Sequence, residues 1–197
     1  GLRVRDAITL RRGRDLASTA QKLEVRQVQF DHITIEQTFT DPLQPNALKR
    51  MLDEYVAPMP VPVTLAAVEV GGATPVAAAI NLETVLRLSF AQPRIAGLYL
   101  AGLVDGELLE ENAGLVDEDD KPTAAGDVLD QLFTKLWHSD ESGRTDESGN
   151  VRTRVFTGWY TLTATLPDGT QITSEAYIPK AERAKMIVLQ ATAAEAK

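Results

Sequence analysis

The sequence contains no cysteine and only two histidines, His32 and His138, in 197 residues. The absence of cysteine excludes disulfide bonds, thiolate metal sites and a cysteine nucleophile. The two histidines are far apart in the sequence, so a metal site built on histidines is not expected. We therefore expect neither a metal centre nor a cofactor.

Positive charge is also scarce, because 20 Lys and Arg residues face 28 Asp and Glu residues, for a net charge of −8. This acidic balance disfavours binding to nucleic acid and to anionic membrane surfaces. No apolar run approaches the length of a membrane span, and no signal peptide is visible. What remains is the composition of a globular protein of one domain, or of one domain with a small appendage.

The first two thirds of the chain alternate between strand and helix signals. Strands are expected over 6–10, 28–39, 61–70 and 95–103, and helices over 15–26, 41–55, 74–90 and 123–139. Alternation with short connections is typical of right-handed βαβ units and a parallel sheet. We therefore predict an α/β fold of about four βα units, in a domain over 1–138.

Two of these helices carry detailed signals. In the helix over 74–90, Thr74 is expected as N-cap and Pro75 as the first helical residue, with Ile80, Leu86 and Phe90 on an apolar side. The helix over 123–139 is expected to bury one stripe, made of Val128, Leu129, Leu132, Phe133 and Leu136.

A second region follows a polar, acidic linker over 139–150. Alternating segments at 151–156, 160–166 and 171–178 predict strands, the last two joined by the turn signal "PDGT", and 185–190 is a further strand candidate. We predict a small antiparallel β unit over 151–197.

Four phrases, in collinear order, resemble glycoside hydrolase family 10 xylanases. They are "KLEVRQVQFDHITIEQTF" (22–39), "ALKRMLDEYVAPMPVPVTLAAVEV" (47–70), "AQPRIAGLYLAGLVDG" (91–106) and "GRTDESGNVRTRVFTGWYTLTATLPDGT" (143–170). The resemblance implies half of a TIM-type (β/α)₈ barrel, corresponding to strands five to eight, followed by a C-terminal β extension. It also implies an extracytoplasmic location, either secreted or periplasmic.

The family hydrolyses glycosidic bonds with two glutamates in the retaining arrangement. The resemblance implies that the acid/base glutamate lies upstream of Gly1 and that Ala67 stands at the nucleophile position. The family's Gln and His fall on Glu36 and Thr38, and its sugar-stacking Trp falls on Ala101. An alanine cannot form a glycosyl-enzyme ester, so the chain is predicted to be a pseudoenzyme with no catalytic residue of its own.

Two alternatives concern the carboxylates. Glu69 follows Ala67 by two positions, and residues two apart on a strand point to the same face. Glu69 could therefore form a relocated catalytic pair with Glu36. The other interpretation is that Glu69 is a solvated carboxylate at the edge of the former cleft. Together Glu36, Thr38, Glu69 and Asp105 define a predicted vestigial cleft. The acidic run over 107–121 lacks the spacing of a calcium loop and is expected to be a solvated loop.

Four strands of a barrel leave one sheet face and two edges uncovered. Because the segments at 61–70 and 95–103 are apolar, we expect an apolar inner face that an upstream segment, another polypeptide or a second copy covers. A glycan is a further candidate partner.

Three functions follow from these observations. The first is a non-catalytic, xylanase-like structural or accessory subunit, or a binding scaffold, in a larger assembly. The second is the C-terminal part of a longer, active endo-xylanase-like hydrolase with relocated carboxylates. The third is a carbohydrate-binding module in the C-terminal β unit, against which stands the adjacency of Trp159 and Tyr160, since neighbouring strand residues point to opposite faces.

Overall fold

The computed structural model describes residues 7–10, 31–39, 42–179 and 185–189. The predicted helix over 15–26 lies outside the described residues, as does the beginning of the strand predicted over 28–39. The described chain forms two compact units that divide between Leu136 and Trp137, and each is considered separately.

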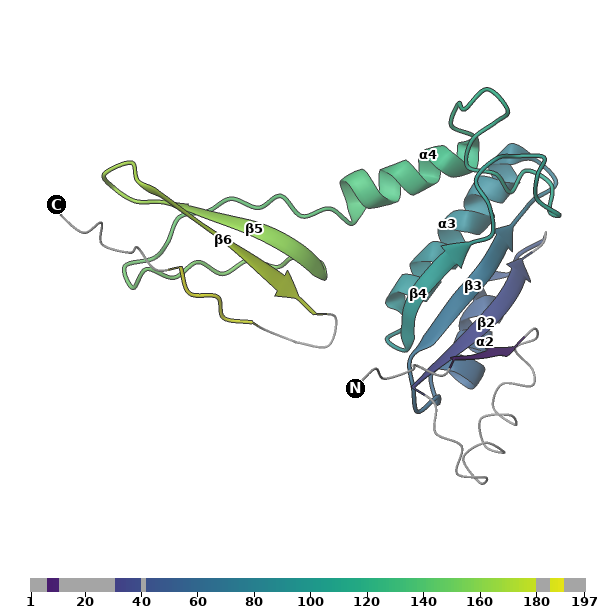
Figure 1. Ribbon diagram of the computed structural model, residues 1–197, viewed down its shortest axis with the longest axis horizontal. Coiled ribbons are helices and arrows are strands. Elements are labelled where there is room, and N and C mark those ends of the chain that lie inside the picture. The colour runs from purple at the N-terminus through teal and green to yellow at the C-terminus, as the bar shows by residue number, and fades with distance from the viewer. Residues whose placement is uncertain (1–6, 11–30, 40–41, 180–184, 190–197) are drawn as a thin grey trace. The chain divides into compact units, whose positions relative to one another are not determined.

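The first unit is built on a four-stranded parallel sheet (Figure 1). Its strands are β1 (Ala7–Leu10), β2 (His32–Phe39), β3 (Val63–Val70) and β4 (Ile95–Leu100), paired in sequence order. The predicted mixed α/β fold with parallel strands is therefore present, and β1 and β4 are its outer strands.

In the described part of the chain, helices follow β2, β3 and β4. They are α2 (Pro45–Met51), which continues into the π-helical turn η2 (Leu52–Val56), α3 (Pro75–Ala91), and α4 (Ala124–Gln131), which continues into the π-helical turn η3 (Leu132–Leu136). Helices α2 and α3 lie on one face of the sheet (Figure 1). Helices on a single face are the arrangement expected of part of a (β/α) barrel, in which all helices lie outside the strands.

The core lies between that sheet face and the helices. Ile33, Ile35 and Phe39 of β2 and the apolar residues of β3 are buried there, and the helices contribute a complementary apolar side. The largest fully buried side chains are Ile33, Leu65, Leu132, Val56, Val63, Val68 and Val85. Burial of these branched side chains stabilises the unit by about 1.5–3 kcal/mol per fully buried residue.

Helix α3 begins as predicted but buries a different side. Thr74 accepts a hydrogen bond from the backbone N–H of Ala77 at 3.1 Å, and Pro75 follows it at the first helical position. However, Ile80 and Phe90 are exposed, and only Leu86 of the predicted apolar side is buried. The buried side combines small residues such as Ala78 with the larger Leu82 and Val85.

Helix α4 also departs from the prediction. Of the expected stripe, Leu132 is buried and Val128 and Leu129 are half-buried, but Phe133 and Leu136 are exposed. Helix α4 packs against α3, and burial continues to Leu132, just past the end of α4, which is 1% exposed. The predicted stripe is therefore buried at Leu132 and exposed at its last two members.

The second unit contains the predicted hairpin, β5 (Gly158–Thr165) paired antiparallel with β6 (Gln171–Ile178). Its turn closes through a hydrogen bond from the Leu166 N–H to the Thr170 carbonyl, with Gly169 at φ 86°. The strands predicted at 151–156 and 185–190 were wrong, because residues 151–156 and 185–189 are not strands in the structure. No described strand borders them to accept ladder hydrogen bonds.

Candidate functional site

The candidate site lies at the carboxyl end of β3, where parallel α/β folds usually carry their functional groups. Strand β3 does not run straight to that end. Glu36 pairs with Ala66 and Thr38 with Glu69, so two steps along β2 match three steps along β3. The same extra residue appears against β4, where Leu65 pairs with Leu98 and Val68 with Leu100. Strand β3 therefore contains a β-bulge over these positions.

Ala67 sits in this bulge with φ 47°, in the left-handed region. A non-glycine residue there is uncommon and costs roughly 1–2 kcal/mol, so the strand end is locally strained. The side chain is exposed and ends at a methyl group. The position that the resemblance assigns to the nucleophile thus presents no group that could attack, donate or accept a proton.

The bulge also changes which residues share a face. Val63 and Leu65 before it and Val68 and Val70 after it are all buried, so the helix-facing parity shifts by one residue. Glu69 consequently lies on the opposite, open face, directly across from Thr38 in the register. A β-bulge changes the face to which the following side chains point. Counting positions from Ala67 in the sequence does not reveal that a bulge determines the face of Glu69.

Glu69 is occupied. Its Oε2 atom accepts hydrogen bonds from the backbone N–H of Leu109 at 3.0 Å and of Glu110 at 3.1 Å. These two amides belong to the loop between β4 and α4. The carboxylate is therefore a loop anchor, which is neither of the two roles expected from the sequence.

Further contacts fasten the same loop to the glycine pair that follows β3. Gly72 donates to the Glu111 carbonyl at 3.0 Å, and Asn112 Nδ2 donates to the Gly72 carbonyl at 2.8 Å. A Cβ on Gly71 would lie 2.7 Å from Cβ of Glu110, so only glycine allows this approach. The loop over 107–112 is seated on the end of β3 by side-chain, backbone and steric complementarity together.

The other predicted cleft residues are distributed as follows. Glu36 lies on β2, opposite Ala66, on the same open face as Thr38 and Glu69. Asp105 does not join them in any described hydrogen bond; its Oδ1 accepts from the Gly114 N–H at 3.2 Å, within the β4–α4 loop. Ala101 continues the pairing of β4 with β3 through its N–H to the Val68 carbonyl at 2.9 Å, and its exposed methyl offers no stacking surface.

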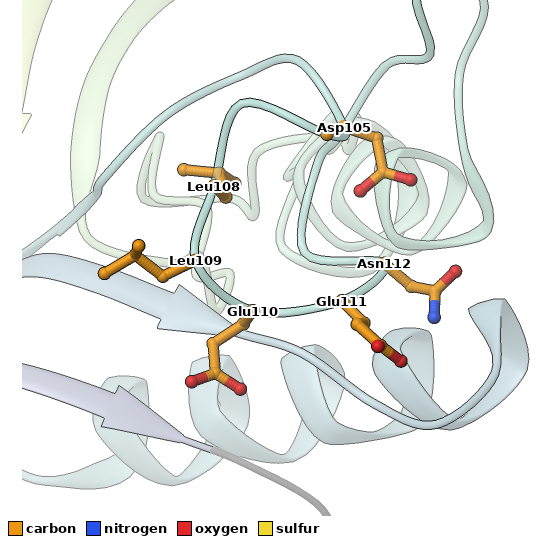
Figure 2. A pocket seen from close by; sticks show the side chains of 7 residues that line it. Asp105, Leu108, Leu109, Glu110, Glu111 and Asn112 are labelled. Carbon is orange, nitrogen blue, oxygen red and sulfur yellow. The ribbon is translucent and has the colours of Figure 1, made fainter.

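A pocket of about 340 Å³ is present nearby, but it is not this cleft. It is an open depression lined by the loop itself, from Asp105 to Asn112. Figure 2 shows the carboxylates of Asp105 and Glu110 at opposite ends of that loop, with Leu108 and Leu109 turned away from Asn112. The acidic side chains thus do not converge, and within the described residues no group of three or more His, Asp or Glu could hold a metal ion.

The open face of the sheet is more polar than predicted. It carries His32, whose Nε2 lies 2.5 Å from Oγ1 of Thr64, together with Thr34 and Glu36 from β2. On β4 it carries Gly97 and the exposed Tyr99, whose ring edge lies beside the space a Gly97 side chain would fill. The apolar leucines of β4, Leu98 and Leu100, pair with helix-facing residues of β3. The open faces of β2, β3 and β4 are therefore less apolar than expected, because the pairing places His32, Thr34, Glu36 and Glu69 on that side.

Sequence reasoning missed a functional candidate in the second unit. Trp159 pairs with Tyr177 across the hairpin, not with Tyr160, and the two ring centroids are 5.4 Å apart with the planes tilted by 48°. The pair follows from a register in which Thr165 pairs with Gln171, whereas equal counting from the "PDGT" turn would have paired Trp159 with Ile178. Tyr160 is half-buried on the other face and donates its hydroxyl to the Phe156 carbonyl at 2.9 Å.

Within the described residues, no helix is long and apolar enough to cross a membrane. No protein-family model matches the sequence.

Solved xylanases have a similar fold. Xylanase 10B from Thermotoga maritima superposes with a TM-score of 0.50 at 15% identity, covering 60% of this chain and 41% of that protein. The intracellular xylanase TsXylA from Thermoanaerobacterium saccharolyticum, solved in complex with xylotetraose, gives 0.51 at 15% identity, covering 64% and 44%. Xylanase 10C from Cellvibrio japonicus, solved with xylopentaose, gives 0.50 at 11% identity, covering 60% and 30%. The chain has a mixed α/β fold that resembles part of TIM-barrel xylanases.

One relative found by sequence comparison is not named as a xylanase. The chain is 28% identical over 163 residues to the anti-sigma-I factor RsgI6 of Acetivibrio thermocellus. The match covers 81% of this chain and 21% of the relative. The chain therefore spans about a fifth of the curated relative and less than half of each xylanase named above.

Proposed function

We propose that this chain is a non-catalytic, xylanase-like module that acts as a structural or accessory part, or as a binding scaffold, of a larger protein or assembly. In this proposal its four strands correspond to strands five to eight of a family 10 barrel. The proposal rests above all on the state of Glu69, the carboxylate that follows Ala67 on β3.

A replacement nucleophile must be able to reach a sugar carbon and form a covalent bond. The Glu69 carboxylate instead accepts two backbone hydrogen bonds from the loop that is seated on the strand end. Attack would require those bonds to break and two amides to lose their acceptor, which costs free energy without stabilising a transition state. Together with the methyl group at Ala67, this arrangement supports a scaffold more than an enzyme.

The printed names of the relatives fit this proposal. The curated relative is called an anti-sigma factor, not a hydrolase, and the xylanases share fold at low identity only. The partial coverage supports a module that works within a longer polypeptide or complex, where an upstream segment or another chain meets the open sheet face. A secreted or periplasmic location is part of the proposal, although one xylanase with this fold is described as intracellular.

The test is turnover of xylan and of an aryl xylobioside at high protein concentration. We expect no release of reducing sugar or of the aryl group above a heat-denatured control. Turnover that is abolished by Glu69→Gln or by Glu36→Gln would overturn the proposal in favour of a hydrolase with relocated carboxylates. Turnover unchanged in both variants would point to a contaminating enzyme, which purification from a second expression host would remove.

The competing hydrolase hypothesis has one observation in its favour, because Glu36 and Glu69 do share the open face. A retaining pair requires carboxyl groups about 5–5.5 Å apart, and an inverting pair about 6.5–9.5 Å. Intact-mass measurement of native material would establish whether a longer polypeptide supplies an additional glutamate.

A further inference from the structure

The exposed face of the β5–β6 hairpin is aromatic at one end and polar along the rest of its length. Eight residues point outward from four alternate cross-strand pairs, and every one of them is exposed. One end carries the aromatic pair Trp159 and Tyr177. The remaining six positions are all polar: Thr161, Thr163, Thr165, Gln171, Thr173 and Glu175.

The aromatic pair is unusually accessible. Trp159 is 75% exposed and Tyr177 is 43% exposed, although tryptophan is highly buried on average. A cross-strand aromatic contact stabilises a hairpin by only about 0.2–1 kcal/mol. Hairpin stability is therefore a weak reason to leave two large rings in water, and recognition of a ligand is a stronger one.

We propose that this face binds a neutral, linear polysaccharide, with Trp159 and Tyr177, whose planes are tilted by 48°, as two separate stacking rings. A pyranose ring has C–H groups on its flat face and hydroxyls around its rim. The flat face packs on an aromatic ring, as other amphipathic groups do, and the rim hydroxyls find partners in threonine hydroxyls and in the Gln171 amide.

Charge decides against the other linear polymers. None of the eight residues of this face is Lys or Arg; Lys185 Nζ donates to the Tyr177 carbonyl at 2.8 Å, and Glu175 adds a compensating negative charge, so the described cations do not form a basic groove. Single-stranded nucleic acid also stacks on aromatic residues, but its binding requires a positively charged groove along the backbone. The same argument excludes glycans that carry carboxylates or sulfates, which leaves a neutral chain.

Shape decides against a protein partner. The face is two strands wide, with strands about 5 Å apart, and eight residues long, or about 25 Å. A stable protein interface buries about 800 Å² per partner around a core poor in polar side chains. Here the apolar part is limited to one pair of rings at one end. A long, narrow, hydroxyl-rich surface matches an extended chain better than a globular surface.

The test is affinity electrophoresis of the full chain in gels that contain soluble arabinoxylan, mixed-linkage β-glucan or galactomannan, with polygalacturonate as the anionic probe. We expect retardation by at least one neutral polysaccharide and none by polygalacturonate. Trp159→Ala is expected to weaken the affinity by about tenfold or more, as truncation of an aromatic anchor does. Tyr177→Ala is expected to weaken it less.

Matched controls separate recognition from general effects. Leu109→Ala removes an even more exposed apolar side chain, 92% accessible, from the first unit, and Trp137→Phe removes the other tryptophan; neither is expected to change retardation. Circular dichroism verifies that the Trp159 and Tyr177 variants remain folded, and Trp159→Phe, which keeps a ring, is expected to retain part of the binding.

Two results would overturn the inference: no retardation by any of the three neutral polysaccharides, or retardation that is unchanged in both Trp159→Ala and Tyr177→Ala. Either result leaves the proposed non-catalytic function intact, because that function concerns the first unit and is tested by turnover.

Discussion

The Oε2 atom of Glu69 accepts a hydrogen bond from the backbone N–H of Leu109. A residue near the end of β3 therefore holds the β4–α4 loop, forty positions further along the chain. The same atom accepts the N–H of Glu110. A carboxylate that accepts two amides is a charge-assisted acceptor, which is stronger than a neutral one. The end of β3 is therefore a structural junction.

This junction predicts a graded response to substitution of Glu69. Glu69→Ala removes the acceptor of both amides and is expected to lower the free energy of unfolding by about 1.5–3 kcal/mol. Glu69→Gln keeps one side-chain oxygen as acceptor and should cost less. Hydrogen exchange at the amides of Leu109 and Glu110 measures the local effect, and urea unfolding the global one.

The control is Glu118→Ala, which removes an exposed acidic residue of the same β4–α4 segment with no described side-chain partner. It changes net charge equally and should leave the two exchange rates unaltered. Equal protection of Leu109 and Glu110 in the wild type and in Glu69→Ala would contradict the anchoring role.

Ala67 gives a second prediction, since its φ of 47° suits glycine better than alanine. Ala67→Gly is expected to raise the free energy of unfolding by about 0.5–1 kcal/mol, because relief of the left-handed strain exceeds the added entropy of the unfolded chain. Thermal and urea unfolding provide the measurement.

Ala66→Gly is the matched comparison, because Ala66 is the preceding residue and lies outside the left-handed region. There the same change should destabilise by about 0.5–1 kcal/mol. If the two substitutions had the same sign, the bulge would not be the feature that distinguishes them.

Gly126 in α4 tests local preference against tertiary packing. In an isolated helix, glycine to alanine is stabilising by about 1 kcal/mol. Here a Cβ on Gly126 would lie 2.1 Å from the carbonyl oxygen of Leu115, an impossible contact that backbone movement must relieve. Gly126→Ala is therefore expected to destabilise by about 1–3 kcal/mol.

Circular dichroism during urea unfolding measures the sign of this effect. Gly143→Ala serves as control, because its one near neighbour is a methyl group of the exposed Val151 side chain at 3.2 Å, not backbone. A stabilising Gly126→Ala would show that α4 does not pack on Leu115 in solution.

Asp168 in the hairpin turn provides a prediction about pH. Hydrogen bonds from the backbone N–H and then the side chain of Thr170 hold the pKa of the Asp168 carboxyl below its ordinary value of 3.8. A carboxyl with a lowered folded-state pKa adds stability above its unfolded pKa, and that contribution disappears as the pH falls through the folded-state pKa. The carboxyl carbon of Asp168 should therefore titrate by NMR with a midpoint below 3.8.

Thr170→Gly keeps the backbone donor and removes the hydroxyl, so it should move that midpoint only part of the way back. A wild-type midpoint at or above the ordinary value would contradict the hydrogen-bonded turn.

Much of the fold could be predicted because its signals are local. The alternation in β2 and β3, the Thr74–Pro75 helix start and the turn after β5 each depend on residues within a few positions of one another. The failures were at the ends of elements and on exposed faces. Four apolar residues predicted to be buried are exposed: Ile80, Phe90, Phe133 and Leu136. Apolar spacing predicts a helix, but it does not specify which side of that helix packs against the rest of the protein.

Sequence reasoning could predict the chemistry of Ala67 in the candidate site but not the role of Glu69. That Ala67 cannot act as a nucleophile follows from its chemistry alone, wherever it lies. Whether Glu69 could replace it depends on the bulge that changes its face and on the loop amides that it binds, and neither is visible in the spacing of two residues. The same holds for Trp159, whose partner Tyr177 is eighteen positions away and is brought beside it by the hairpin register.

The sequence by itself determined which chemical groups this protein has: no thiol, few histidines, an alanine at a position where related sequences suggest a glutamate, and alternating patterns that form parallel strands and one hairpin. Only the tertiary structure decided how those groups are used. Hydrogen bonds and packing between segments far apart in the chain commit Glu69 to a loop, turn polar side chains toward the open sheet face, and pair two aromatic rings on an exposed surface.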